Sequence, residues 1–212
     1  MLNAALGYAM ASATISAAMA AEAMVGRGDE REAEEAAAAA MRDALNAIDI
    51  AGNVVVGEVD GQILNVGEKV GTGSGPELDI ALEALEGTTL TAKAMSNAIA
   101  VIAACPRGRL LQVPDLYMEK LAVGPGYERG VVDLDASAGE NAIRLAKAKG
   151  VDVRQITACV LDRPRHEKII AALRKAGARI NLIPDGDVAG VLNAAMPETG
   201  IDMYVGQGKA PE

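Results

Sequence analysis

Two carboxylates stand three residues apart in the stretch EALEGTT, where Glu83 and Glu86 are followed at once by Gly87 and Thr88. Mg²⁺ and Mn²⁺ take oxygen ligands, usually one or two carboxylates together with waters and phosphate oxygens of a substrate. Gly87 lets the backbone approach a phosphate closely, and the Thr88 hydroxyl offers a partner to a bound water. The stretch therefore indicates a metal-assisted phosphate site.

The same residues also fit a helix that has no chemical role. Pro76 suits a first helical position, the leucines of residues 77–86 recur at helical spacing, and Gly87 is typical of a helix end. On this stretch alone the pattern favours a helix over 77–86, and the two alternatives stay open here.

An acid also follows the β-branched run NVVVGEV, residues 53–59, which predicts a buried strand. Ligands of open α/β sheets bind at the carboxyl ends of strands, so Glu58 is a candidate ligand there. An acid that begins a turn is the alternative. The nearby GTGSGP lacks the Lys-Ser/Thr pair of a nucleotide P-loop and adds little.

Two later stretches carry groups that suit a phosphosugar. In LDRPRH, Arg163 and Arg165 flank a proline, and guanidinium groups fork onto phosphate oxygens. A solvated basic helix start is the alternative. In IPDGDVAG, Asp185 and Asp187 surround Gly186, an arrangement that could hold sugar hydroxyls or cap the following helix.

The composition limits the kind of core and the class of partner that the chain can have. The chain has 212 residues, half of them hydrophobic, with no Phe or Trp, four Tyr and nine Met, so a large core must be filled by small and flexible side chains. Its net charge is −9, and its 20 basic residues are scattered rather than run together. This distribution argues against a nucleic-acid partner.

The cysteines and the first 25 residues bear on the compartment. Cys105 and Cys159 are too few for a disulfide framework or a zinc cluster, and we expect two buried thiols in a reducing compartment. The Ala-rich start has no basic residue before its apolar part and is interrupted by polar residues, unlike a secretory signal. We expect no membrane-spanning helix and a cytoplasmic location.

The order of elements predicts an α/β fold. Two Ala-rich helices are expected at 1–25 and 30–48, two short elements at 96–105 and 107–113, and a loop-rich stretch at 114–137. Helix, strand, helix and strand then alternate between 139 and 195, which indicates an α/β layer. We expect two lobes, residues 1–130 and 131–212.

Taken together, the motifs resemble one family. GRGDE, VVVGE, VGEKVGTGSGP, LDIALEALEGTTLTAKAMSNAIAVIA, PDLYMEKLAVGP, LDRPRH, IPDGDVAG and GQGKAPE occur in the order of the class II fructose-1,6-bisphosphatases. The resemblance implies a layered α-β-α-β-α sandwich of the lithium-sensitive sugar-phosphatase type. It also implies metal-dependent hydrolysis of the 1-phosphate of fructose-1,6-bisphosphate, in gluconeogenesis or the Calvin cycle, with sedoheptulose-1,7-bisphosphate as a second substrate in some members.

The resemblance further assigns roles to residues of this chain. It implies Mn²⁺ or Mg²⁺ as the metal, catalytic roles for Glu86 and Thr88, a sugar bisphosphate as ligand and a homo-oligomer. The implied metal ligands are Glu34, Glu58, Glu83, Glu86 and Glu212. The implied substrate contacts are Glu86, Gly87, Thr88, Tyr117, Arg163, Pro164, Arg165, Asp185, Gly186 and Asp187.

The chain departs from the family pattern at several points. Family members usually have Asp at the positions of Glu34 and Glu83, and Asp-Pro in place of Glu83-Ala84. The acidic GEGE-x-DEAPM stretch is reduced to GEVDGQ, and the usual Gly-Gly is Gly208-Lys209. Relatives also continue beyond Glu212, so the second lobe is expected to be incomplete. These departures predict weak metal binding and weak activity, or a phosphosugar-binding relative without turnover.

Overall fold

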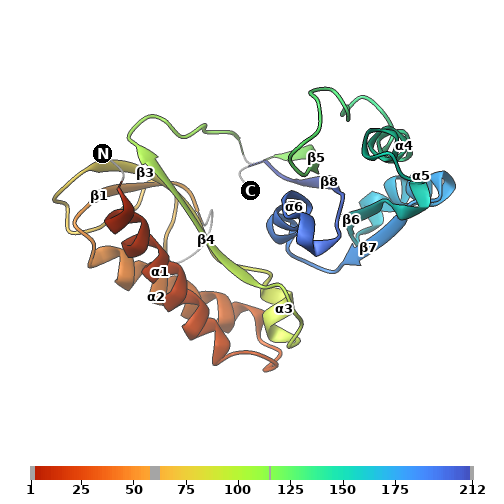
Figure 1. Ribbon diagram of the computed structural model, residues 1–212. Helices are drawn as coiled ribbons and strands as arrows, with labels where there is room; N and C mark the ends of the chain where they lie inside the picture. The colour runs from red at the N-terminus through yellow and green to blue at the C-terminus, as the bar shows by residue number, and fades with distance from the viewer. Residues whose placement is uncertain (1–2, 58–62, 115, 211–212) are drawn as a thin grey trace. The chain divides into compact units, whose positions relative to one another are not determined.

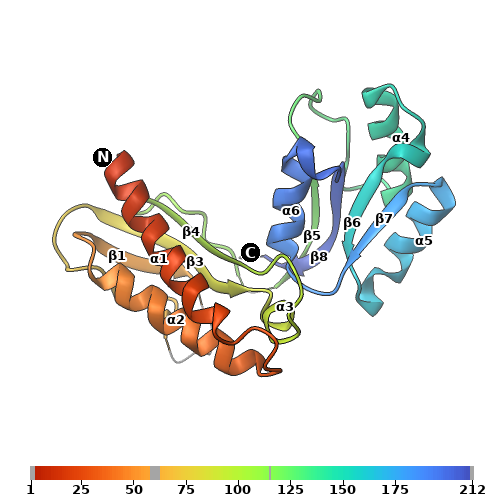
Figure 2. The ribbon, with the colours of Figure 1, turned by 60° about the horizontal axis from the view of Figure 1, so that its bottom comes forward.

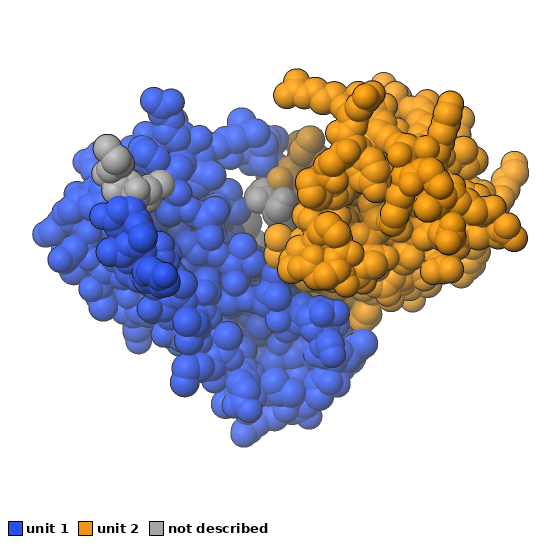
Figure 3. Space-filling view, viewed as in Figure 1, with its two compact units in different colours: residues 1–114, 211 blue, residues 115–210, 212 orange. Residues whose placement is uncertain are grey.

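The computed structural model describes residues 3–57, 63–114 and 116–210 and divides the chain into two compact units, Met1–Pro114 and Asp115–Ala210 (Figure 3). We expected the lobes to meet at residues 130 and 131. The division falls earlier because Tyr117–Val123 is a strand that pairs along its whole length with the second unit's sheet.

The first unit places two helices on one face of a four-stranded sheet (Figure 1). The sheet order is β2-β1-β3-β4, in which β1 and β3 are parallel and the other two pairs are antiparallel. The elements are α1 (Ala4–Glu22), α2 (Glu30–Asn46), β1 (Ala51–Val56), β2 (Lys69–Val70), β3 (Glu77–Glu86), α3 (Thr88–Ala92) and β4 (Ile99–Pro106).

The predicted helices at 1–25 and 30–48 are confirmed as α1 and α2. Each begins at an oxygen-bearing cap, because the Asn3 and Asp29 side chains accept hydrogen bonds from backbone N–H groups of the first turn. Ala13, Ala17 and Ala21 are buried on α1 at a spacing of four, which makes a flat stripe on which α2 packs closely.

The second unit carries helices on both faces of its sheet (Figure 2). The sheet order is β5-β8-β6-β7; β8, β6 and β7 are parallel, and β5 runs antiparallel to β8. One face packs on α4 and α5, the other on α6. The elements are β5 (Tyr117–Val123), α4 (Ala138–Lys149), β6 (Thr157–Leu161), α5 (Glu167–Ala176), β7 (Arg179–Ile183), α6 (Asp187–Ala195) and β8 (Met203–Lys209), with short 3₁₀ turns at Val153–Gln155, Pro164–His166 and Pro197–Thr199.

The expected α/β sandwich is confirmed by these two units of mixed sheet and packed helices. The helix–strand alternation after residue 139 is also confirmed. Of the strand predicted at residues 53–59, residues 53–56 belong to β1. Two local predictions are wrong. Residues 107–113 form no helix or strand, and the loop-rich stretch contains β5.

The favoured helix over 77–86 is also wrong, because these residues form the strand β3. Leu78, Leu82 and Leu85 have helical spacing in the sequence. The strand wins because β1 and β4 lie on either side of it and satisfy its backbone hydrogen bonds along both edges.

Among the described residues, α1 is long and apolar enough to cross a membrane by the criteria of length and composition alone, contrary to our expectation. The same criteria are met by a core helix of a soluble protein. Met10 and the alanine stripe of α1 belong to the buried core of the first unit, so this helix is at least in part a core helix.

Only one of the two cysteines matches the expectation of buried thiols. Cys159 on β6 is fully buried, whereas Cys105 on β4 is partly exposed. Burial raises the pKa of the Cys159 thiol from 9.0 to about 11, because the apolar surroundings disfavour the thiolate.

We predict that Cys159 resists alkylation in the folded protein while Cys105 reacts. At pH 8 the raised pKa alone lowers the thiolate fraction of Cys159 by about 100-fold relative to an ordinary thiol. Because the unfolded thiol ionises first, the free energy of unfolding should also fall as the pH rises from about 9 to about 11. Iodoacetamide labelling followed by peptide mass spectrometry measures both rates. Equal rates in the native protein would contradict the burial of Cys159, and equal rates in urea provide the control.

Candidate functional site

The first unit places Glu83 and Glu86 at the carboxyl end of β3. In the pairing with β4, Glu83 lies opposite Val101 and Glu86 opposite Ile99, so three steps along β3 match two steps along β4. This register shift is a β-bulge, a feature that re-aims side chains and recurs beside active sites.

The bulge decides which way the two carboxylates face. Side chains alternate between the faces of a regular strand, so residues three apart would lie on opposite faces. Here Leu82, Ala84 and Leu85 all belong to the core beneath the helices, so the alternation is broken between Ala84 and Leu85. Glu83 and Glu86 therefore share the face that points away from this core.

A sharp turn follows the second carboxylate. Gly87 has φ +91°, in the left-handed region, and a Cβ there would lie 2.8 Å from the Leu90 side chain. The turn opens the short helix α3, whose first residue, Thr88, is half-buried. Glu86 itself is 9% exposed. The chain thus brings a buried carboxylate, a backbone turn and a hydroxyl into consecutive positions.

The other predicted metal ligands are only partly visible. Glu34 is half-buried in the first turns of α2, which packs on α3 and β3. Glu58 and Glu212 lie outside the described residues. Within residues 3–57, 63–114 and 116–210, no three His, Cys, Asp or Glu side chains form a group that could hold a metal ion. The carboxylate oxygens on β3 are ligands that a hard divalent cation prefers, and both carboxylates lie on the same face of the strand. They supply two ligands of such a site.

The second unit gathers its predicted residues where its parallel strands end. Leu161 of β6 lies opposite Ile183 of β7, so the loops that follow these strands start side by side. Arg163 in the first loop then reaches Asp185 in the second, with 3.6 Å between guanidinium nitrogen and carboxylate oxygen. This edge of a parallel sheet is where α/β proteins bind ligands.

A buried imidazole fixes the arginine loop. His166 is fully buried, with Nδ1 2.8 Å from the Leu161 carbonyl oxygen and Nε2 2.9 Å from the Gln207 backbone nitrogen. Because the Gln207 N–H donates to Nε2, the proton of the neutral ring belongs on Nδ1, where it donates to Leu161. The ring therefore links the end of β6 to β8.

The second arginine is held by two contacts. Arg165 donates through Nε to the Gln207 carbonyl oxygen at 3.1 Å, and its guanidinium lies over the Tyr117 ring, 5.1 Å from the ring centroid. A guanidinium stacked on a tyrosine is favourable by about 0.5–1 kcal/mol at an exposed site. Both contacts use Nε and the face of the guanidinium group rather than its terminal nitrogens.

Asp187 begins α6 and is buried against a lysine. Lys120 Nζ on β5 lies 3.0 Å from Asp187 Oδ2, and both side chains are largely buried. Gly208 on β8 makes room for this pair, since a Cβ there would lie 2.3 Å from the same oxygen. Gly186, just before Asp187, has φ +84° and turns the chain into α6.

The second unit thus brings together Tyr117, Arg163, Pro164, Arg165, Asp185, Gly186 and Asp187, which the sequence assigned to substrate binding. Guanidinium groups beside carboxylates suit a ligand that carries both phosphate and hydroxyl groups. Sequence reasoning missed Lys120, Gln207 and the role of His166. Being the only histidine of the chain was the one signal that could have pointed to His166.

We predict that Lys120→Met lowers the free energy of unfolding by about 3–5 kcal/mol, because it removes the buried ammonium beside the Asp187 carboxylate. The double change Lys120→Met with Asp187→Leu should recover most of that loss. Urea unfolding followed by circular dichroism measures both. Arg31→Met, which breaks the exposed Arg31–Glu35 pair, is the control and should cost less than about 0.5 kcal/mol. A Lys120→Met variant as stable as the control would contradict the buried pair.

Comparison with known proteins places the chain among relatives. Residues 4–212 match the model of a family described as bacterial fructose-1,6-bisphosphatase, glpX-encoded. Over 202 residues the chain is 44% identical to fructose-1,6-bisphosphatase 1 class 2 of Escherichia coli K12, a match that covers 94% of this chain and 60% of that protein. The class 2 fructose-1,6-bisphosphatases of Escherichia coli O6:H1 and Shigella flexneri match with the same identity and coverage. The chain spans about 60% of the length of these relatives.

Proposed function

The chain belongs to the family of glpX-encoded bacterial fructose-1,6-bisphosphatases, and from that membership we propose that it hydrolyses the 1-phosphate of fructose-1,6-bisphosphate. One observation carries the proposal. The substrate contacts implied by the family pattern in the second unit converge at one sheet edge, although they come from three separate stretches of the chain.

The two units take different parts of this reaction. In the second unit, Arg163 and Arg165 hold the phosphate that is not cleaved, while Asp185 and Asp187 accept hydrogen bonds from sugar hydroxyls. In the first unit, Glu86 and the Gly87 backbone contact the substrate near the 1-phosphate. The Thr88 hydroxyl orients the attacking water.

Mn²⁺ or Mg²⁺ would be held by Glu83 and Glu86 together with Glu34, Glu58 and Glu212. When bound, such an ion neutralises charge on the phosphoryl oxygens. The facing of Glu83 and Glu86 set by the β-bulge supports this assignment.

The departure at Glu83-Ala84 favours a second candidate function, phosphosugar binding without turnover. The family's proline fits the structure, because Ala84 lies inside the bulge, where a proline costs no regular ladder hydrogen bond. Glu83 is one methylene longer than the usual Asp, which displaces a ligand of a metal with strict octahedral geometry.

The class of ligand, the oligomeric state and the cellular location are part of the same proposal. A net charge of −9 argues against a nucleic acid, and a small anionic substrate therefore needs metal ions or a local basic pocket. We propose a homo-oligomer that works in the cytoplasm, in gluconeogenesis or the Calvin cycle. The alanine stripe of α1 is buried in the core of the first unit, which supports a location outside the membrane.

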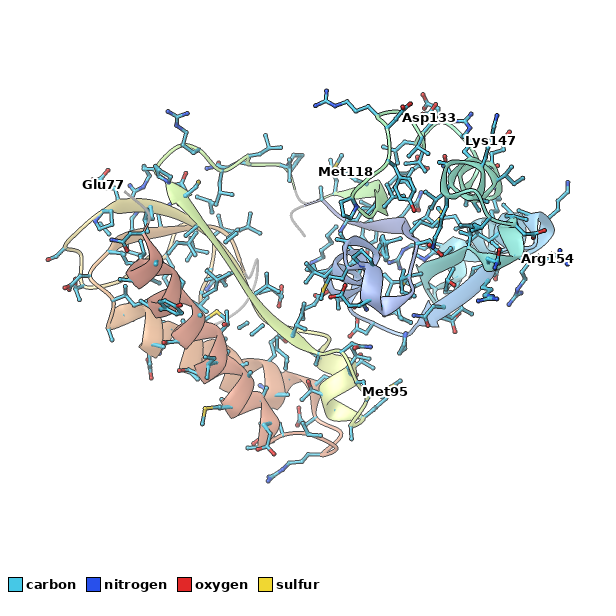
Figure 4. All side chains as sticks on the ribbon, viewed as in Figure 1. Glu77, Met95, Met118, Asp133, Lys147 and Arg154 are labelled. Atoms are coloured by element: carbon cyan, nitrogen blue, oxygen red, sulfur yellow. The ribbon has the colours of Figure 1, made fainter. Side chains whose placement is uncertain are left out.

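We predict phosphate release from fructose-1,6-bisphosphate that requires Mn²⁺ or Mg²⁺, is abolished by EDTA and is slower than that of a full-length relative assayed alongside. Glu86→Gln should lower the rate by about 100-fold or more, because a neutral amide binds the metal and orients the substrate poorly. Glu77→Gln is the matched control, since Glu77 is an exposed acid at the other end of the same strand (Figure 4).

Two further outcomes separate the candidates. Undetectable release with retained phosphosugar binding would favour the binding function, and Glu83→Asp with Ala84→Pro should then raise metal affinity and restore turnover. Release that persists without any divalent ion would overturn the metal assignment.

We also predict that Arg165→Ala weakens binding of fructose-1,6-bisphosphate by about 10-fold to 150-fold, the loss expected for a hydrogen bond to a charged group. Arg179→Ala is the control, because Arg179 is an exposed arginine at the amino end of β7, the opposite edge of the same sheet. Isothermal titration measures both affinities. If the two variants bind alike, Arg165 is only a solvated residue at the start of a helix.

A further inference from the structure

The Gln207 backbone on β8 is bonded by side chains where a neighbouring strand would normally bond it. Its N–H donates to His166 Nε2 at 2.9 Å, and its carbonyl oxygen accepts from Arg165 Nε at 3.1 Å. The N–H and C=O of one strand residue point to the same side of the strand, and β5 lies along the other side of β8. On the bonded side β6 ends at Leu161, so two consecutive side chains of the next turn continue its edge.

The His166 ring is fixed in place by contacts on several sides. Nδ1 lies 2.8 Å from the Leu161 carbonyl oxygen, and the backbone N–H of the same histidine donates to the Arg163 carbonyl oxygen at 2.9 Å. A Cβ on Gly206 would lie 3.3 Å from Cε1 and 3.4 Å from Nε2, so the backbone of β8 packs against the ring. These contacts come from the chain itself, so the ring holds the Gln207 N–H before any ligand binds.

Arg165 is ordered by its neighbours in the same way. Pro164 restricts the backbone before it, its Nε is bonded to the Gln207 carbonyl oxygen, and its guanidinium lies over the Tyr117 ring. An arginine side chain without such contacts loses much rotamer entropy when it binds a ligand. Here the Nε bond sets the plane of the guanidinium beforehand, and that bond depends on a carbonyl group whose own residue is held by His166.

We propose that His166 is a positioning residue for phosphate binding, which acts through Gln207 to hold the Arg165 guanidinium in one orientation before the ligand arrives. Preorganising a binding group raises affinity, because the group is already ordered when the ligand binds. The inference rests on the proposed contact between Arg165 and the phosphate that is not cleaved. It goes beyond that contact by assigning a role in ligand affinity to a fully buried residue.

The state of the ring can be tested directly, because His166 is the only histidine of the chain. In a ¹⁵N-labelled sample at neutral pH, long-range ring correlations should show the proton on Nδ1 and an unprotonated Nε2 that accepts a hydrogen bond. A proton on Nε2 would overturn the proposal, since that nitrogen could no longer accept from the Gln207 N–H. This measurement depends on neither metal nor turnover.

A double-mutant cycle tests whether His166 acts through Arg165. His166→Asn should weaken binding of fructose-1,6-bisphosphate, measured by isothermal titration, by about 3-fold to 10-fold, the range expected for ordering one long side chain. In an Arg165→Ala background the same change should cause no further loss. Unchanged affinity of His166→Asn, or an equal loss in both backgrounds, would overturn the proposal.

A control separates positioning from loss of stability. Leu173→Ala removes a fully buried side chain of α5 and should lower the urea midpoint of unfolding without changing the affinity. A loss of affinity in Leu173→Ala as large as that in His166→Asn would overturn the positioning role. If Arg165→Ala itself binds normally, the proposed phosphate contact fails and this inference fails with it, whereas a normal His166→Asn beside a weakened Arg165→Ala rejects the inference alone.

Gly206→Ala tests the same link with the ring still present, in case His166→Asn does not fold. The added Cβ would press on the edge of the ring and disturb the bond at Nε2, so binding should weaken by about 2-fold or more, again only where Arg165 is present. Gly7→Ala is the matched control, because nothing lies within 4 Å of a Cβ there. Equal affinities of these two variants would overturn the proposal.

Discussion

Close approach between backbones is the constraint on which the rest of this structure depends. With no Phe or Trp, large rings such as that of Tyr204 fill little of the core, and many elements come together over Ala and Gly. A Cβ on Gly139 of α4 would lie 2.6 Å from the Ala172 carbonyl oxygen of α5, and one on Gly190 of α6 would lie 2.8 Å from the Tyr204 ring on β8. Each of these distances is shorter than a side chain allows, so the glycines set how near the helices lie to each other and to the sheet.

The same close approach shapes the ligand-binding edge of the second unit. Gly208 leaves the space in which Lys120 meets Asp187, and Gly206 lies against the His166 ring, where a Cβ would be 3.3 Å from Cε1. β8 therefore supplies room and backbone hydrogen bonds rather than side chains. The glycines that let β8 pack closely thus also leave space for the His166 ring and for the Lys120–Asp187 pair.

Most helices of both units could be predicted from the sequence, whereas β3 of the first unit and β5 of the second could not. In the second, strands alternate with helices that end at Gly150 and Gly177, and the loops after β6 and β7 carry their own turn residues. In the first, Leu78, Leu82 and Leu85 imitate a helix, and only the pairing with β1 and β4 decides for a strand. Lys120 and Gln207 escaped prediction because their partners lie 67 and 41 residues away, and no local pattern records such a contact.

The bulge in β3 decides whether the side chains of Glu83 and Glu86 lie on the same face of the strand. A strand has two sides, so whether two carboxylates can serve one ion depends on whether the spacing between them behaves as odd or even. Because the bulge adds one residue near Ala84, Glu83 and Glu86 share a face although they are three residues apart. Loss of a single residue there would leave the same acids two apart in a regular strand, still on one face, whereas straightening the bulge at constant length would separate them. In this chain, the segment can therefore change in length by one residue only if the shape of the strand changes as well.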